Sequence, residues 1–400
     1  FGCGTSGDAI RFLMLFERLT FAEAVTDLAN KVGVELRHEG KSNQRKPDQE
    51  AGLRALQLAS DFYQQQLQGS TGQDVRAYLD QRYVPAEWQK RFQLGFAPDD
   101  WRRLHQHLLT QKIPVQIQEQ CGLVKMAEQQ ERRYDRFRNR LIFPIGDRRG
   151  RPIAFGGRAL GEARAKYLNS PETPLFHKGA TLYNFANARQ AAGEGGRVIV
   201  VEGYMDVIAL AQAGFPEAVA PLGTALTEEQ MQLLWRAAPN PLLCFDGDAA
   251  GERAAARALE RALPLMTPQR TLGFVALPEG QDPDDLIAAE GRAAMEHLLD
   301  HALGSSEMIW RVACAGHPPD TPEDAARRDE AALSMVGRIG DPVLQRSLRD
   351  AVWERIRAER AARRSQRGGG RRGSAGAGLP GGRGGLGLPQ IPIAAANPAR

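Results

Sequence analysis

The stretch that decides the fold is RVIVVEGYMD at residues 197–206, in which an apolar run is followed at once by acids and a glycine. A second stretch of the same kind is PLLCFDGD at 241–248. Working outward from these two, we expect further short strands at 217–220 and 271–276 and helices at 205–213, 227–237 and 249–263. Apolar strands that alternate with helices are typical of a parallel sheet covered on both faces. The sequence therefore predicts an α/β fold here.

Acidic side chains follow three of the predicted strands. They are Glu202 after the first strand, Asp246 and Asp248 after the third, and Asp282, Asp284 and Asp285 in the loop beyond the fourth. Parallel strands present their carboxyl ends at one edge of the sheet, so these acids should converge there. Clustered carboxylates repel one another unless a cation is bound, and Mg²⁺ combines one or two carboxylates with water and phosphate oxygens. The pattern predicts a divalent metal site suited to phosphoryl chemistry.

Single members of this set also have plain structural interpretations. Asp248 can be only the N-cap of the helix that follows it, and Asp-Pro-Asp at 282–284 can be only a turn. Asp206 lies one helical turn beyond Glu202. The joint occurrence of acids at the ends of successive strands favours the metal site over these interpretations.

A basic stretch lies earlier in the chain, at residues 132–166, with eleven Arg or Lys against three acids. A charge run of this kind is often no more than a solvated face. Arg136, Arg138 and Arg140 are spaced two apart, so on an extended chain their guanidinium groups would form one row at phosphate-like spacing. The stretch is therefore predicted to contact nucleic acid.

Composition excludes a wholly disordered chain and a membrane-spanning one. The 400 residues are 42% hydrophobic and 25% charged, which is ordinary for globular domains. The net charge is +4, but residues 1–359 hold 44 basic and 48 acidic side chains, or −4, because eight Arg and no acid lie from Arg360 onward. No apolar run reaches the roughly 20 residues of a membrane span. Four scattered cysteines without a signal peptide indicate a reducing cytoplasm and no disulfides.

Several motifs now combine into a resemblance. The acid motifs are VEGYMD at 201–206, FDGDAAG at 245–251 and QDPDD at 281–285. The others are YDRFRNRLIFP at 134–144, GGR at 156–158, KYLNSPETP at 166–174 and FHKG at 176–179. The first group resembles the Toprim fold, and the two groups together resemble the bacterial replicative primase of the DnaG type. The resemblance runs from Phe1 to about Arg360.

The resemblance implies a DNA-dependent RNA polymerase that makes short primers on single-stranded DNA from ribonucleoside triphosphates by two-metal transfer. The catalytic acids it implies are Glu202, Asp246 and Asp248. The residues it implies as ligands of Mg²⁺ or Mn²⁺ are Glu202, Asp206, Asp246, Asp248, Asp282 and Asp284. The residues assigned to template or nucleotide contacts are Arg136, Arg138, Asn139, Arg140 and Lys166.

The two ends of the chain match the family less fully. Cys3 in FGCG resembles the last ligand of the primase zinc-binding domain, and one ligand cannot hold zinc. We therefore expect a fragment that lacks most of that domain, with Zn²⁺ bound only in the full-length protein. A replicative helicase is the expected partner of the family, but no segment resembling its docking domain is recognisable.

The expected fold is a Toprim-type parallel sheet flanked by helices, with an α+β N-terminal subdomain and a C-terminal helical subdomain. The expected parts are a zinc-domain remnant at 1–37, a linker at 38–50, the basic N-terminal subdomain of the polymerase core at 51–195, the Toprim domain at 196–290, a helical subdomain at 291–362 and a disordered Gly/Arg/Pro-rich tail at 363–400. Two alternatives stay open, namely another Toprim activity such as DNA cleavage, and a noncatalytic nucleic-acid-binding protein. The primase-like motifs disfavour the first, and the intact acids disfavour the second.

Overall fold

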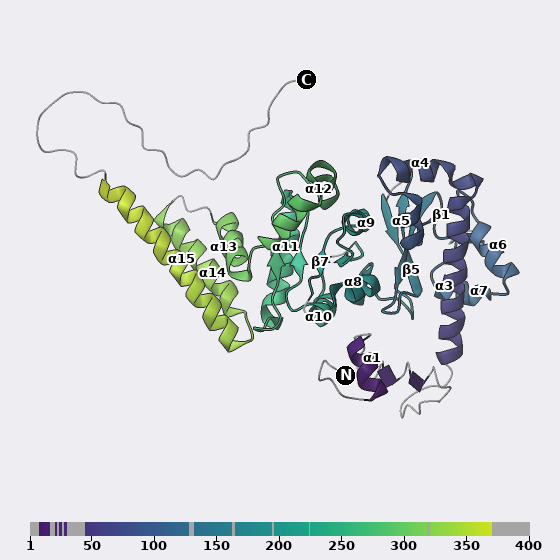
Figure 1. The fold of residues 1–400 in the computed structure, drawn as a ribbon, viewed down its shortest axis with the longest axis horizontal. Helices are drawn as coiled ribbons and strands as arrows, with labels where there is room; N and C mark the ends of the chain where they lie inside the picture. The colour runs from purple at the N-terminus through teal and green to yellow at the C-terminus, as the bar shows by residue number, and fades with distance from the viewer. Residues whose placement is uncertain are drawn as a thin grey trace, which may run out of the picture. The chain divides into compact units, whose positions relative to one another are not determined.

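The structure is a computed structural model, drawn in Figure 1. It describes residues 8–16, 21, 24–25, 28–29, 45–127, 132–161, 165–193, 196–223, 225–317 and 321–369. Cys3 lies outside these residues, as does the tail from 370 onward. None of the helices in the described ranges is long and apolar enough to cross a membrane.

Helices form the first layer after α1 (Ala9–Phe16). They are α3 (Arg45–Gln68), η1 (Ser70–Gly72), α4 (Gln73–Gln81), α5 (Ala86–Arg91), α6 (Arg103–Thr110) and α7 (Val115–Gln120). The long helix α3 packs against strands of the first sheet because its apolar side chains, including Leu56 and Tyr63, are fully buried. It begins at Arg45, within the stretch expected to be a linker at 38–50.

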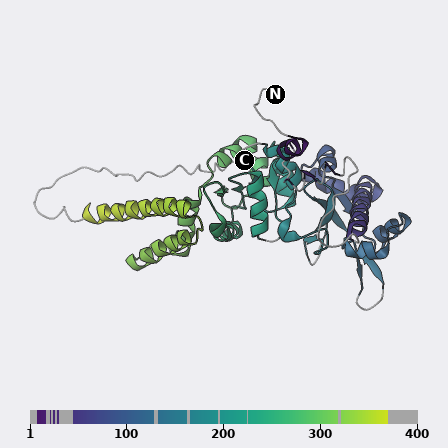
Figure 2. The ribbon, with the colours of Figure 1, turned by 90° about the horizontal axis from the view of Figure 1, so that it is seen from below.

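The first sheet is antiparallel, with the order β1-β4-β5-β6. Its strands are β1 (Gly95–Ala97), β4 (Arg140–Gly146), β5 (Pro152–Ala159) and β6 (Tyr167–Asn169). Figure 2 shows the separate hairpin of β2 (Val124–Met126) and β3 (Arg133–Asp135) extending away from it. Leu141 and Phe143 in β4 belong to one buried cluster and Ile142 to another. The sheet is therefore buried on both faces, which explains the continuous apolar run LIF.

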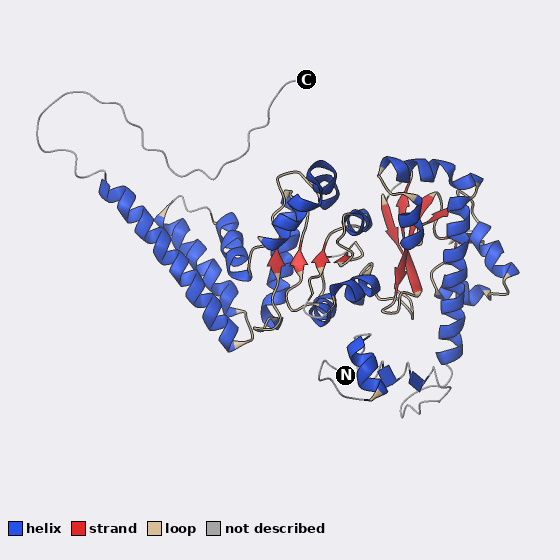
Figure 3. Cartoon of the chain, in the orientation of Figure 1, coloured by secondary structure: helices blue, strands red, loops and turns tan. Residues whose placement is uncertain are grey.

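The second sheet is parallel, with the order β10-β9-β7-β8, and Figure 3 shows helices on both sides of it. Its strands are β7 (Ile199–Val200), β8 (Ala218–Val219), β9 (Leu242–Leu243) and β10 (Gly273–Phe274). Its helices are α8 (Phe185–Ala192), α9 (Tyr204–Gln212), α10 (Glu228–Ala237), α11 (Ala249–Ala262) and α12 (Pro283–Asp300), with η2 (Lys178–Ala180) and η3 (Leu263–Leu265) beside them. The predicted α/β fold is confirmed.

Side-chain caps explain where these helices begin. Thr227 Oγ1 accepts a hydrogen bond from Gln230 N–H, and Gln230 Oε1 accepts one from Thr227 N–H, so α10 has a complete capping box.

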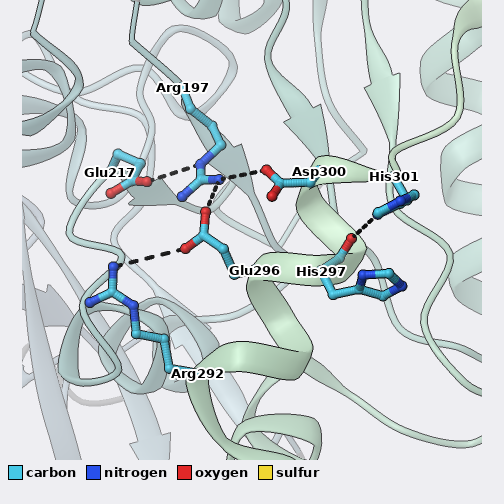
Figure 4. Close-up of polar contacts among 7 residues, drawn as sticks. All are labelled: Arg197, Glu217, Arg292, Glu296, His297, Asp300 and His301. Carbon is cyan, nitrogen blue, oxygen red and sulfur yellow. Dashed lines mark hydrogen bonds and ion pairs between the residues drawn. The ribbon is translucent and has the colours of Figure 1, made fainter.

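At the amino end of the sheet, Arg197 binds Glu217 and Glu296, the latter at 2.7 Å, and so fastens α12 to β7 and β8 (Figure 4). The buried core continues from β4 into β7 without a break at the expected boundary of 195/196.

Three helices close the described chain: α13 (Ser305–Gly316), α14 (Pro322–Gly337) and α15 (Pro342–Gly369). Arg328 and Asp329 are buried in α14 and form an ion pair of 2.8 Å. The chain divides into two compact units at residues 352/353. The helix α15 extends to Gly369 and so includes residues 363–369, where the expected tail begins.

Candidate active site

Glu202 and Asp246 lie side by side at the carboxyl edge of the parallel sheet. Glu202 follows β7, Asp246 follows β9, and the two strands are neighbours. The backbone N–H of Asp246 donates to Glu202 Oε1 at 3.3 Å. From β7 the chain winds to β8 on one side, whereas β9 and β10 lie on the other, so these acids flank the point where the winding reverses. Open parallel sheets bind their ligands at this point.

Asp206 joins this edge from the first turn of α9. Its Oδ2 accepts the backbone N–H of Gly203 at 2.8 Å, which fixes the carboxylate over the loop that carries Glu202. Burial, followed by the charges of Asp282 and Asp246, raises the pKa of Asp206 to about 7. A buried carboxylate beside other negative charges is stabilised in its ionised form by a nearby cation.

Asp246 has the same electrostatic character. Burial and the neighbouring charges of Glu202, Asp282, Asp248 and Asp285 raise its pKa to about 6. Its Oδ1 is buried and has no hydrogen-bond partner among the described residues. A buried carboxylate oxygen without a donor is costly unless something else neutralises it, and a divalent cation would do so.

Asp248 and Asp282 both cap helices. Asp248 Oδ1 accepts from Ala250 N–H at 2.7 Å and Gly251 N–H at 2.8 Å, and these bonds lower its pKa. Asp282 Oδ1 accepts from Asp285 N–H at 2.7 Å. The N-cap interpretation of Asp248 is therefore confirmed. It does not exclude metal binding, because both capping bonds use Oδ1 and neither uses Oδ2.

Asp284 lies in the first turn of α12 and already has a cationic partner. Arg82, at the end of α4, donates to its Oδ2 at 2.8 Å. Burial raises the pKa of Asp284, while Arg82 opposes that rise. Sequence reasoning missed Arg82, since nothing in the local pattern of α4 links it to an acid 202 positions away.

The carboxylates as a set suit a Mg²⁺ site that water and phosphate oxygens complete, rather than a site formed by protein ligands alone. No group of three His, Cys, Asp or Glu side chains within the described ranges is close enough to hold an ion alone. After burial, the charges of Asp282 and Asp246 nevertheless raise the pKa of Asp206, and those of Glu202 and Asp282 raise the pKa of Asp246. Mg²⁺ needs only one or two carboxylates when water and phosphate oxygens complete its shell, so the arrangement suits an ion that arrives with a nucleotide.

The basic stretch does not form the expected row of arginines. Asn139 has a φ of 48°, which breaks the extended chain between β3 and β4. Arg136 donates to Asn169 O at 2.7 Å, whereas the Arg140 guanidinium donates to the carbonyls of Ala165 and Lys166. Arg138 stacks 3.6 Å above an exposed indole, that of Trp101. The period-two prediction was wrong because the residues connect two strands rather than lying within one.

Of the five residues assigned to template or nucleotide contacts, Asn139 and Lys166 are exposed and the three arginines are partly buried. Lys166 directs only its backbone carbonyl to Arg140. Asn169 and Tyr204 are further residues that the motifs contained and our assignment omitted: the Tyr204 hydroxyl donates to Asn169 Oδ1 at 2.6 Å. The signal for both was their place inside the quoted motifs KYLNSPETP and VEGYMD.

A parallel sheet in this strand order, with a glutamate after one central strand and Asp-x-Asp after the next, defines the Toprim class of domain. A family model of the Toprim domain matches residues 196–271, and one of the DNA primase catalytic core, N-terminal domain, matches 62–189. The chain belongs to the family of DnaG-type bacterial DNA primases.

Relatives of known sequence and structure show the extent of the similarity. The DNA primase of Escherichia coli strain K12 is 42% identical over 359 residues, which cover 89% of this chain and 62% of that protein. A DnaG primase catalytic domain bound to ssDNA is 41% identical with a TM-score of 0.70, covering 77% of this chain and 99% of that one. A DNA primase domain from Pseudomonas aeruginosa is 42% identical with a TM-score of 0.71, covering 76% and 95%.

The comparison corrects one prediction. A family model of the CHC2 zinc finger matches residues 1–44, so the expectation that most of the zinc-binding domain is missing was wrong. The chain spans about three fifths of the length of the Escherichia coli relative.

Proposed function

We propose that the chain is the catalytic part of a DNA primase, which joins ribonucleotides on a single-stranded DNA template. The observation that carries this proposal is the cluster of Glu202, Asp206 and Asp246 at the reversal point of the sheet, with an unpartnered buried oxygen on Asp246. The similar catalytic domain bound to ssDNA supports the choice of template.

Glu202, Asp206, Asp246 and the free Oδ2 of Asp248 would hold Mg²⁺ or Mn²⁺, with Asp282 and Asp284 beside them. Bound divalent ions activate a 3′-hydroxyl and neutralise the charge of a pyrophosphate leaving group. The backbone N–H of Asp246 donates to Glu202 Oε1 and so holds the Glu202 carboxylate in place, which means that this ligand needs little rearrangement. Exposed Lys166 and Asn139, with Arg138 beside Trp101, are proposed to contact template or nucleotide phosphates. The guanidinium groups of Arg136 and Arg140 donate to backbone carbonyls and are proposed to shape that surface.

A zinc ligand and two partners are also proposed. Residues 1–44, which the CHC2 zinc finger model matches, contain Cys3. We propose that Cys3 is a ligand of a bound Zn²⁺. The proposed partners are single-stranded DNA and ribonucleoside triphosphates.

The test is incorporation of labelled ribonucleotides on single-stranded DNA with Mg²⁺, with and without a pre-annealed RNA primer. Asp246→Asn removes one charge from the acid edge, and Glu290→Gln, at an exposed position of α12, is the matched control. We expect template-dependent RNA from the wild type and the control, and about a 10²- to 10³-fold loss in Asp246→Asn. DNA cleavage without RNA synthesis would support a nuclease instead, and binding alone would support a noncatalytic protein.

A further inference from the structure

Asn169 connects three segments that are far apart in the sequence. Its Oδ1 accepts the Tyr204 hydroxyl at 2.6 Å, and its Nδ2 donates to Leu222 O at 2.8 Å. Its backbone carbonyl accepts from Arg136 Nη2 at 2.7 Å. One residue at the end of β6 therefore touches the basic segment, the start of α9 and the loop after β8.

Tyr204 is fixed on every side. Its ring stacks on Phe143 with centroids 4.8 Å apart and planes 11° apart, and it meets Tyr183 edge-on at 4.8 Å. A Cβ at Gly156 would lie 2.5 Å from the Tyr204 hydroxyl oxygen. Burial raises the pKa of Tyr204, so the hydroxyl stays a neutral donor. The ring and its hydroxyl can therefore occupy a single position.

Because of its place in the chain, Tyr204 links its hydrogen bond with Asn169 to the positions of two acids. Tyr204 stands midway between Glu202 and Asp206, and its N-cap neighbour Gly203 donates to the Asp206 carboxylate. A fixed position of Tyr204 therefore restricts the positions of both acids. Asn169 also accepts a hydrogen bond from Arg136, near the start of the basic stretch at 132–166.

We propose that Asn169 and Tyr204 are positioning residues, which hold the acid edge of the parallel sheet in a fixed place relative to the basic segment so that metal-bound nucleotide and template meet in one geometry. The inference rests on the proposed function for its kinetic consequence. Its structural consequence, the placement of the metal-binding acids, does not require that function.

Tyr204→Phe tests this with a matched control, Tyr183→Phe. Both tyrosines are buried in the same aromatic cluster, but the Tyr183 hydroxyl has no hydrogen-bond partner among the described residues. We expect Tyr204→Phe to bind Mn²⁺ about 3- to 10-fold more weakly by electron paramagnetic resonance titration. We also expect kcat for nucleotide incorporation to fall about 10- to 100-fold with little change in the KM for template. Tyr183→Phe should match the wild type in both measurements.

Asn169→Ala and the double variant complete a cycle. If the two side chains act through one bond, the double variant should lose no more than the worse single variant. The proposal is overturned if Tyr204→Phe retains wild-type Mn²⁺ affinity and kcat, or if it lowers only the melting temperature. If the wild type makes no RNA, the proposed function fails, and the Mn²⁺ titration alone decides the positioning role.

Discussion

Arg82 and Asp284 form an ion pair of 2.8 Å although 202 positions separate them in the chain. The pair joins the end of α4, in the helical layer, to the first turn of α12, beside the acid edge of the parallel sheet. It places a permanent positive charge next to carboxylates that burial leaves poorly solvated. Arg82 therefore competes with metal ions for the same negative charge.

Arg82→Ala is expected to tighten Mn²⁺ binding at low salt, because it removes that competing charge. Coulomb attraction at a partly exposed site predicts about a 2- to 5-fold effect, which added salt should reduce. Isothermal titration measures it. Arg349→Ala, at an exposed position of α15 where the side chain contacts Gln345, is the control. Weaker Mn²⁺ binding in Arg82→Ala would contradict this account.

Asp248 has a capping role and a proposed metal role that two substitutions separate. Asp248→Ser keeps a good N-cap for α11, so its free energy of unfolding should stay within about 0.5 kcal/mol of the wild type, whereas Asp248→Ala should lose about 1 kcal/mol. Both variants lose the carboxylate and should lose RNA synthesis. Urea unfolding and nucleotide incorporation distinguish the roles. An active Asp248→Ser would show that only the cap matters.

The stability of the metal-free protein should decrease as pH rises from about 4 to about 7, where unfolded carboxyls with a pKa of about 3.9 have lost their protons. The folded state keeps Asp206 and Asp246 protonated further into this range, since their pKa values are raised to about 7 and about 6. The folded state thus binds more protons, and its advantage disappears above the higher pKa. Melting temperatures measured across this range test the sign.

Mg²⁺ should reverse part of that loss, because a cation favours the ionised carboxylates. We expect the ion to raise the melting temperature by a few degrees at about pH 8 and by less at about pH 5. Asp206→Asn can still accept the Gly203 N–H and should flatten both the pH dependence and the Mg²⁺ effect. An equal Mg²⁺ shift at both pH values would argue against binding at this edge.

Gly156→Ala should destabilise the protein and disturb the acid edge together, since the added Cβ collides with the Tyr204 ring. Overpacking of this kind costs about 1–3 kcal/mol. Gly161→Ala is the control, because a Cβ there meets no atom within 4 Å. Unfolding by urea and Mn²⁺ titration are the measurements. Equal stability of the two variants would show that Tyr204 can move aside.

Much of the candidate site was readable because it follows from strand ends. Glu202 and Asp246 were expected at one edge, and the structure places them on adjacent strands with a hydrogen bond between them. The row of Arg136, Arg138 and Arg140 was not readable, because alternation has meaning only inside a strand, and these residues form a connection with a left-handed Asn139.

The sequence alone determined the parallel sheet, its helix caps and the acids at its carboxyl edge, because apolar periodicity, capping chemistry and strand direction are local properties of the chain. Only the tertiary structure decided which distant groups meet those acids. Arg82 reaches Asp284, and Asn169 ties Tyr204 to Arg136, through packing of elements that the sequence separates. Such contacts depend on how the layers pack in three dimensions. A local sequence pattern does not specify which distant residues this packing brings together.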